Sequence, residues 1–250
     1  MKQTSSGHRQ RGLPGCESYL EWLRNNPHLE HAYATLLERL YLCDSRKSSK
    51  SLLITSTQPA EGKTTVAVTL SLTATVAEKK VLLIDADFKK PRIHRLLGLD
   101  NSLGLSHALS GRAQMNEVIQ EIKMSVDGGG PKPLHVMTSG SLDAPKGNIV
   151  LKMNSPAFGE ILDYAGRHFD LIILDSAPAL AVIDPLFLAP HVDDVVLVLA
   201  PGVVVEKDAK QAKARIEQAG GRILGVVLNG FSEKLHGPGY HPYYQDYVTG

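Results

Sequence analysis

The stretch from Ser51 to Thr65, SLLITSTQPAEGKTT, constrains the fold of this chain more than any other part of the sequence. It begins with an apolar run, continues through a turn-forming loop, and reaches Gly-Lys-Thr-Thr at the start of a long stretch without helix breakers. A loop between a buried strand and a helix directs backbone N–H groups and the positive end of the helix dipole at an anion. The stretch therefore predicts a phosphate-binding loop.

This loop fits the pattern G-x-x-x-x-G-K-[ST] at Gly62, Lys63 and Thr64, whereas Thr57 stands where the first glycine belongs. Lys63 is expected to reach the β and γ phosphates of a nucleotide, and the Thr64 hydroxyl to ligate Mg2+. The alternative is a plain strand-turn-helix connection in which Lys63 is a solvated charge. The order of strand, turn, Gly-Lys-Thr and helix favours the nucleotide site. The loop residues expected to bind the nucleotide are Pro59, Ala60, Glu61, Gly62, Lys63, Thr64 and Thr65.

The composition is that of a globular chain with no dominant charge. Of the 250 residues, 43% are hydrophobic, and the formal net charge is +1, which argues against nucleic acid or an anionic membrane as a partner. Cys16 and Cys43 form no C-x-x-C pair, so neither a zinc site nor a disulfide framework is expected. No segment has the roughly 18 apolar residues of a membrane span or the core of a signal peptide. We expect a cytoplasmic protein that reaches the inner face of the membrane only through a partner.

Apolar runs of strand length alternate with helical patterns along most of the chain. This alternation predicts an α/β fold with a doubly wound, mainly parallel sheet and helices on both faces. The strand at 134–138 is weaker than the others. The expected strands are residues 52–54, 81–85, 134–138, 169–175, 193–200 and 222–229.

Four segments follow from these patterns. Residues 1–15 are polar and predicted to be disordered, and residues 16–45 form a helical extension. Residues 46–231 form the nucleotide-binding domain. Residues 232–250 are expected to be a flexible tail.

One helix of the extension carries an apolar stripe at three- and four-residue steps. It is expected either to pack on its own domain or to contact another subunit. The stripe consists of Leu29, Ala32, Leu36, Leu40 and Cys43.

Carboxylates follow two of the expected strands. Asp85 and Asp87 end one strand and Asp175 ends another, so all three should line the sheet edge that holds the phosphate loop. Three crowded carboxylates would repel one another unless a cation lay among them, which favours Mg2+ over a set of simple turn caps. Lys89 follows at once and is a weaker candidate for contact with nucleotide phosphates, since a solvated basic helix fits equally well.

The end of the chain concentrates aromatic residues. Glycine and proline deny this segment a helix or a central strand, yet flexible termini are usually depleted of aromatics. The tail leaves the last strand at the sheet edge that holds the phosphate loop. About nine extended residues span roughly 30 Å, enough to reach its own site or that of a neighbour. Four of the eight tyrosines fall here, at Tyr240, Tyr243, Tyr244 and Tyr247.

With these features, the chain resembles the bacterial tyrosine autokinases that control capsular and exopolysaccharide synthesis, in their form without a fused membrane segment. The marks of the resemblance are TSTQPAEGKTT, VLLIDADFKKP, IILDSAP and the terminal tyrosine cluster. Any one motif alone is typical of the wider class of chromosome-partitioning and division-site P-loop ATPases. Those relatives carry a second lysine early in the loop, where this chain has Gln58.

The resemblance implies an ATP- and Mg2+-dependent protein tyrosine kinase that phosphorylates its own tail. By position, Lys63 and Thr64 would hold the phosphates and Mg2+. Asp85 and Asp175 would complete the metal site, with Asp85 and Lys63 also counted as catalytic. Asp87 would accept the proton of the incoming tyrosine, as phosphoryl transfer requires a base near the attacking hydroxyl.

The resemblance also implies an adenine contact at Asn229 and a membrane polysaccharide co-polymerase as partner, with homo-oligomers possible through exchange of tails. Members usually carry E-x-x-R-x-x-R on the N-terminal helix, used to close subunit rings. Here the matching residues are His31, Ala34 and Leu37, which cannot form those ion pairs. Lys89 likewise replaces an arginine. Two alternatives are a nucleotide-switched positioning ATPase without kinase activity and a binding subunit without turnover.

Overall fold

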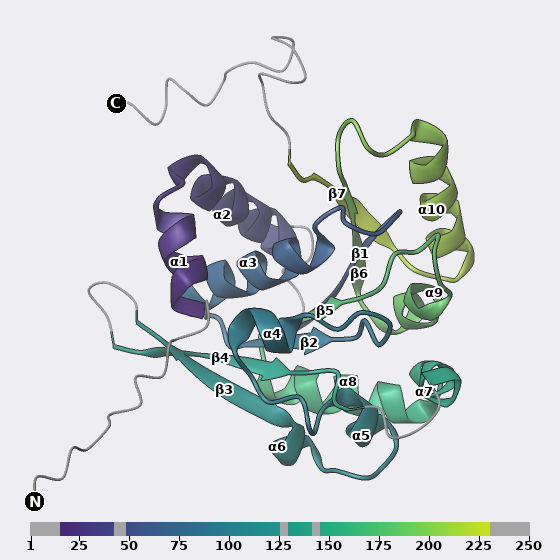
Figure 1. The fold of residues 1–250 in the computed structure, drawn as a ribbon, viewed down its shortest axis with the longest axis horizontal. Helices are drawn as coiled ribbons and strands as arrows, with labels where there is room; N and C mark the ends of the chain where they lie inside the picture. Colours follow the sequence, from purple (N-terminus) through teal and green to yellow (C-terminus); the bar gives the residue numbers. More distant parts are fainter. Residues whose placement is uncertain (1–15, 43–48, 126–129, 142–145, 231–250) are drawn as a thin grey trace, which may run out of the picture.

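The computed structural model describes residues 16–42, 49–125, 130–141 and 146–230. The predicted disordered N-terminus and the tyrosine tail lie outside these ranges. The described strands form one sheet of seven in the order β3-β4-β2-β5-β1-β6-β7, and every pairing is parallel except that of β3 with β4 (Figure 1). The strands are β1 (Lys50–Ser56), β2 (Val81–Asp85), β3 (Ile119–Met124), β4 (Lys132–Met137), β5 (Leu171–Asp175), β6 (Asp194–Leu199) and β7 (Ile223–Leu228).

Helices cover both faces of this sheet, which confirms the doubly wound prediction. The face formed with the N-terminal helices is packed by α1 (Cys16–Arg24), α2 (Pro27–Leu42), α3 (Lys63–Val76) and α4 (Ile93–Leu97). The other face is packed by α5 (Leu105–Leu109), α6 (Met115–Val118), α7 (Lys146–Met153), α8 (Pro156–His168), α9 (Asp184–Leu188) and α10 (Glu206–Gln218), with the 3-10 helix η1 (Ala189–His191).

Each central strand supplies both cores, because successive side chains point to opposite faces. Leu52 and Ile54 of β1 join the core under α3, and Leu53 between them joins the core under α8. All seven residues of β1 are buried, as expected for a strand in the interior of a parallel sheet. The continuous apolar runs in the sequence therefore mark strands covered on both sides.

Strand β3, helices α6, α7 and α9, and the 3-10 helix η1 were not predicted. Strand β3, with the sequence IQEIKM, lies at the sheet edge and is mostly half exposed, so it lacks the apolar run on which strand prediction depended. Helix α7 precedes α8 and was also missed. The expected strand at 134–138 is confirmed as β4.

The predicted apolar stripe on α2 is confirmed only in part. Leu40 is buried and Leu36 packs half-buried against the core, while Cys43 lies outside the described residues. The buried residues are Tyr33, Leu37 and Leu40, whereas Leu29 and Ala32 are exposed. The helix packs on α3 of its own domain, as one of the two alternatives required. The buried face of α2 thus overlaps the predicted stripe but is centred differently, and periodicity alone does not fix that centre. Among the described residues, no helix has the length and apolar content needed to cross a bilayer.

A buried ion pair ties α2 to the sheet. The Lys50 ammonium at the start of β1 lies 2.9 Å from Asp194 of β6 and donates a hydrogen bond of 2.7 Å to the carbonyl oxygen of Leu40. Nε of Arg222 lies 2.7 Å from the other oxygen of the Asp194 carboxylate, which is fully buried. Lys50 thus connects the last turn of the helical extension to the centre of the sheet.

We expect Lys50→Met to destabilise the fold by about 3 kcal/mol, because it leaves the buried Asp194 with Arg222 alone and the Leu40 carbonyl without its donor. The free energy of unfolding in urea measures this. Lys210→Met is the matched control, since it removes an exposed pair with Glu206 and should change stability little. Equal stability of the two variants would contradict a structural role for Lys50.

Candidate active site

The phosphate loop occupies residues 57–62, between β1 and α3. Ala60 and Gly62 have positive φ, at 71° and 87°. Residues of left-handed conformation alternating with ordinary ones form a concave nest of N–H groups, here at the N-terminus of a 14-residue helix. The positive φ of Gly62 disfavours any residue with a Cβ, and a Cβ there would also lie 1.8 Å from Nδ2 of Asn229 and displace that side chain. Thr57 is tolerated in place of the first glycine because its φ is not positive.

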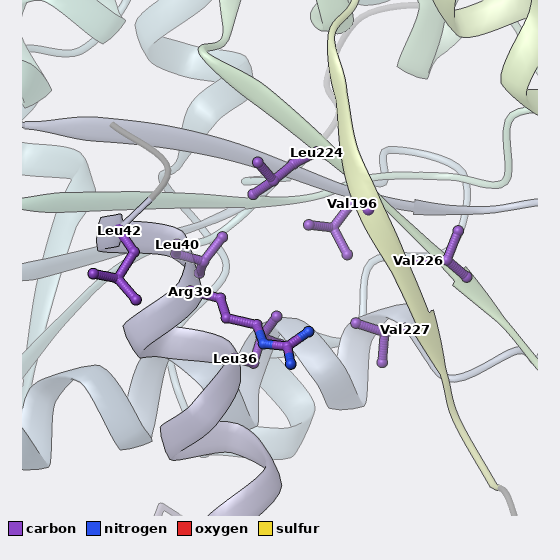
Figure 2. Close-up of a pocket in the computed structure, with 9 residues that line it drawn as sticks. Leu36, Arg39, Leu40, Leu42, Val196, Leu224, Val226 and Val227 are labelled. Atoms are coloured by element: carbon purple, nitrogen blue, oxygen red, sulfur yellow. The ribbon is translucent and has the colours of Figure 1, made fainter. Parts of the chain in front are cut away.

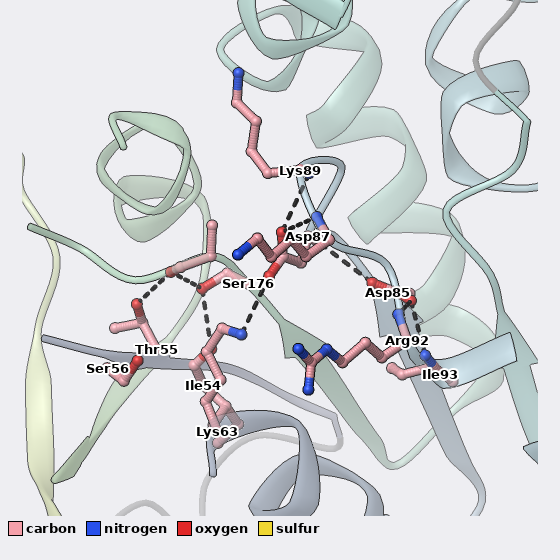
Figure 3. Close-up of polar contacts among 12 residues, drawn as sticks. Ile54, Thr55, Ser56, Lys63, Asp85, Asp87, Lys89, Arg92, Ile93 and Ser176 are labelled. Atoms are coloured by element: carbon pink, nitrogen blue, oxygen red, sulfur yellow. Dashed lines mark hydrogen bonds and ion pairs between the residues drawn. The ribbon is translucent and has the colours of Figure 1, made fainter. Parts of the chain in front are cut away.

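Lys63 and Asp87 face each other across the carboxyl edge of the sheet. Nζ of Lys63 lies 3.1 Å from Oδ2 of Asp87, and both side chains are largely buried, at 13% and 4% exposed (Figure 3). The other oxygen of Asp87 accepts hydrogen bonds from the backbone N–H groups of Lys89 and Lys90, at 3.2 and 2.9 Å. The loop after β2 thereby holds the Asp87 carboxylate toward the phosphate loop.

Asp85 and Asp175 are paired in register on neighbouring strands β2 and β5. Burial raises the pKa of Asp85, and the adjacent charge of Asp175 raises it further. The Asp85 carboxylate accepts N–H bonds from Asp87, Arg92 and Ile93, at 3.1 to 3.2 Å. Both of its oxygens are therefore engaged in shaping the loop that follows β2.

Asp175 differs in having an oxygen to spare. Burial raises its pKa, while the charge of Lys63 and a hydrogen bond from the Thr64 hydroxyl act in the opposite direction. Within the described part of the chain, Oδ1 of Asp175 has no hydrogen-bond partner. A buried carboxylate oxygen without a partner is costly and calls for a proton or a cation.

Thr64 and Asp175 fit Mg2+ better than Asp85 does. No group of three His, Cys, Asp or Glu side chains among the described residues is arranged to hold a metal. Mg2+ does not need one, because it uses one or two carboxylates and completes its shell with phosphate oxygens and water. The free oxygen of Asp175 beside the Thr64 hydroxyl suits that mode of binding.

The side chains of three predicted site residues, Lys89, Asn229 and Glu61, do not point where the sequence suggested. Lys89 is exposed, and its side chain points away from Asp85 in Figure 3. Nδ2 of Asn229 donates to the carbonyl oxygen of Glu61 at 3.0 Å, so this amide holds the loop. The Glu61 carboxylate is turned into the protein, where it accepts bonds from Thr57 and from the backbone of Gln58.

Arg92 is a site residue that the sequence analysis missed. Its positive charge lowers the pKa of Asp175, and its side chain extends toward Lys63 in Figure 3. Its position in the basic segment after Asp87 could have pointed to it. That segment has four Lys or Arg residues among eight, and the sequence does not show which of them faces the site. The four tail tyrosines lie outside the described residues.

A separate apolar groove lies between α2 and the edge strand β7 (Figure 2). It has a volume of about 280 Å³ and is lined by Leu36, Arg39, Leu42, Leu224 and Val226, among others. It shares no lining residue with the phosphate loop. The groove is therefore not part of the candidate active site.

The fold and the loop together define a P-loop nucleotide-binding protein. Residues 50–217 match the family described as AAA domain. The chain is 32% identical over 204 residues to tyrosine-protein kinase YwqD of Bacillus subtilis (strain 168), which covers 82% of each chain. It spans only 26% of tyrosine-protein kinase etk of Escherichia coli (strain K12), at 32% identity.

Solved structures agree. The kinase domain of Escherichia coli tyrosine kinase ETK superposes with a TM-score of 0.79 at 30% identity, covering 97% of this chain and 89% of that one. The cell division ATPase MinD of Pyrococcus furiosus gives 0.59 at 26% identity, covering 74% and 75%. The chain belongs to the bacterial tyrosine autokinases, a family of protein tyrosine kinases within the P-loop ATPases, as the resemblance predicted.

We expect Asp175→Asn to raise the melting temperature of the nucleotide-free protein, because it removes one of three buried, mutually repelling carboxylates. A gain of about 1 kcal/mol corresponds to roughly 2–4 °C in a chain of this size. The same variant should lose the additional stabilisation that Mg2+ confers together with nucleotide. Differential scanning calorimetry with and without Mg2+ and ADP tests both effects. Asp163→Asn on the exposed side of α8 is the control, and a fall in the nucleotide-free melting temperature specific to Asp175→Asn would contradict the expectation.

Proposed function

We propose that the protein binds ATP with Mg2+ at the phosphate loop and transfers the γ-phosphoryl group to the tyrosines of its own tail, Tyr240, Tyr243, Tyr244 and Tyr247. The observation that carries this proposal is the ion pair between Lys63 and Asp87. It brings the phosphate-binding lysine and a buried carboxylate to one point. A nucleotide-switched positioning ATPase would use the same lysine and could use the carboxylate to orient water, so the four tail tyrosines and membership of the family are what favour transfer to tyrosine.

Lys63 and Asp87 would act in turn as the nucleotide binds and the phosphoryl group is transferred. In the nucleotide-free protein, Lys63 neutralises Asp87. When the β and γ phosphates enter the nest, the Lys63 ammonium turns to them, and Oδ2 of Asp87 becomes available to the hydroxyl of a tail tyrosine. The tyrosine oxygen bonds to the γ phosphorus, the bond from that phosphorus to the β–γ bridging oxygen breaks, and Asp87 takes the hydroxyl proton.

The other residues would position the reactants. Thr64 and Asp175 would hold Mg2+, which supplies neutralising charge on the phosphates when bound. Asp85 would keep the loop after β2 in place through its three backbone N–H bonds. Arg92, which already acts on Asp175, is placed to add positive charge near the transferred group. Asn229 would set the position of the loop, with adenine contact a further role.

The proposal extends to the cellular location of the kinase and to its partner protein. We infer that the kinase works at the inner face of the cell membrane with a polysaccharide co-polymerase and regulates polymer synthesis or export. The support is membership of the family. Phosphates on the tail add about −1.5 to −2 charges each, which would drive a modified tail away from the acidic site.

Lys63→Met tests the transfer. Purified protein incubated with ATP and Mg2+, with and without an activating membrane fragment, should acquire phosphotyrosine at the four tail positions by mass spectrometry. The variant should lose the modification by at least about a hundredfold, because the charge that stabilises the transferring phosphate is gone. Lys207→Met removes an exposed lysine on α10 and should retain it. If neither the wild type nor Lys63→Met acquired phosphotyrosine with the activator present, kinase activity would be refuted. ATP hydrolysis without phosphate on the tail would favour the positioning ATPase.

Asp87→Asn separates binding from chemistry. The carboxamide still accepts the backbone N–H bonds of Lys89 and Lys90, but it cannot take up a proton. Phosphotyrosine formation should fall by about 10² to 10⁴, the usual contribution of a general base. Binding of a fluorescent ATP analogue should stay within a few fold of wild type or tighten, since Lys63 no longer has an anionic competitor. Full activity in this variant would exclude Asp87 as the proton acceptor.

A further inference from the structure

The carboxylate of Glu61 lies inside the phosphate loop. The residue is only 1% exposed, although it directly precedes Gly62 and Lys63 at the start of α3. A buried carboxylate destabilises a protein by several kcal/mol unless hydrogen bonds or charges compensate it. The partners of Glu61 therefore indicate what its burial achieves.

Those partners come from the same loop. The Thr57 hydroxyl lies 2.8 and 2.9 Å from the two carboxylate oxygens, and the backbone N–H of Gln58 donates to Oε2 at 2.7 Å. Hydrogen bonds to an ionised acceptor are short and strong. Because donors and acceptor lie within five residues, they close the loop on itself. Thr57, which is fully buried, thus takes part in holding the loop where the sequence pattern calls for glycine.

The closed loop contains a strained residue. Ala60 has a φ of 71°, a left-handed conformation that is unfavourable for any residue with a Cβ. Such residues persist where the surroundings over-determine them. Here the hydrogen bonds from Thr57 and Gln58 to the Glu61 carboxylate join the residues before Ala60 to the residue after it, and so hold Ala60 in this conformation.

Two contacts also hold the loop from outside. Nδ2 of Asn229 at the end of β7 binds the carbonyl oxygen of Glu61 at 3.0 Å. The side chain of Gln58 donates to Asp208 of α10 at 2.8 Å, in an exposed position. The Asn229 contact acts on the backbone of Glu61, so side-chain and backbone contacts of one residue meet at the same turn.

We propose that Glu61 is a positioning residue, whose carboxylate, through Thr57 and Gln58, holds the loop in the shape that presents its N–H nest and Lys63 to the nucleotide phosphates. This inference rests on the proposed nucleotide site. It assigns the side chain of Glu61 to the loop and leaves only its backbone for phosphate. The arrangement also keeps a negative charge, which would repel phosphates, bound to donors of the loop.

Thr57→Val and Thr57→Ser test the proposal as a pair. Valine keeps the shape of the side chain and removes the donor, whereas serine keeps the hydroxyl. Hydrogen exchange by mass spectrometry on the nucleotide-free protein should show residues 57–62 exchanging about tenfold faster in Thr57→Val and near the wild-type rate in Thr57→Ser. The dissociation constant of a fluorescent ATP analogue with Mg2+ should rise about tenfold in Thr57→Val, while exchange in β1, β5 and α8 stays unchanged.

Glu61→Gln adds a test of the charge, with Glu160→Gln on the exposed surface of α8 as its control. The amide should weaken nucleotide binding severalfold and raise exchange in the loop, and the control should do neither. Wild-type exchange and affinity in both Thr57→Val and Glu61→Gln would overturn the proposal, as would equal losses in Thr57→Val and Thr57→Ser. If the wild-type protein bound no nucleotide, the proposed function would fail, whereas the exchange rates would still decide the role of Glu61.

Discussion

The structure depends on charge concentrated at the carboxyl ends of β1, β2 and β5. Three aspartates, Asp85, Asp87 and Asp175, are each at most 3% exposed, and the ammonium of Lys63 lies among them. Parallel strands bring their carboxyl ends to the same edge, so the topology itself creates this crowding. The raised pKa values of Asp85 and Asp175 reflect both burial and mutual repulsion. A fold that maintains such a site carries electrostatic repulsion that the binding of a cation would relieve.

Different groups compensate the burial of the three carboxylates. Asp85 is satisfied by backbone N–H groups, Asp87 by Lys63 and two N–H groups, and Asp175 by Thr64 with one oxygen left over. Among the described residues, Asp175 has an oxygen without a partner, and Asp87 has an oxygen that becomes free when Lys63 moves away from it. Asp85 has no such oxygen. All three follow from the same pattern in the sequence, since Asp85 and Asp175 end buried strands and Asp87 lies two residues after one. The hydrogen bonds show that Asp85 organises the loop after β2, and they support the proposed roles of Asp87 as base and Asp175 as metal ligand.

The fold was largely predictable because burial on two sides leaves a strong signal. VLLID and LIILD are continuous apolar runs, and both form central strands with every residue buried. Strand β3 was not predictable in this way, because its antiparallel pairing at an edge requires no apolar run. The stripe on α2 was only partly predictable for a related reason. Helical periodicity shows that an apolar face exists, and Leu40 lies on it, but contact with α3 and the sheet determines that Tyr33 and Leu37 complete it.

The candidate site was predictable to the level of backbone position and no further. Lys63 and Asp87 meet because the P-loop follows β1 and Asp87 follows β2, and the carboxyl ends of these parallel strands lie at the same sheet edge with only β5 between them. The inward carboxylate of Glu61, the loop contact of Asn229 and the reach of Arg92 depend on side-chain direction, which spacing does not encode.

The end of β7 links the site to the segment that follows it. The backbone N–H of Asn229 donates to Leu199 of β6 at 2.8 Å, and its side chain holds the loop carbonyl of Glu61. The residues after Gly230, which include the four tyrosines, are thus covalently attached beside the loop that carries Lys63. A substrate joined to the enzyme by about nine residues has a local concentration in the millimolar range, without any affinity of its own. For the proposed tail substrate, attachment would remove the need for a deep peptide pocket, and specificity would come from attachment together with the proposed role of Asp87 as base.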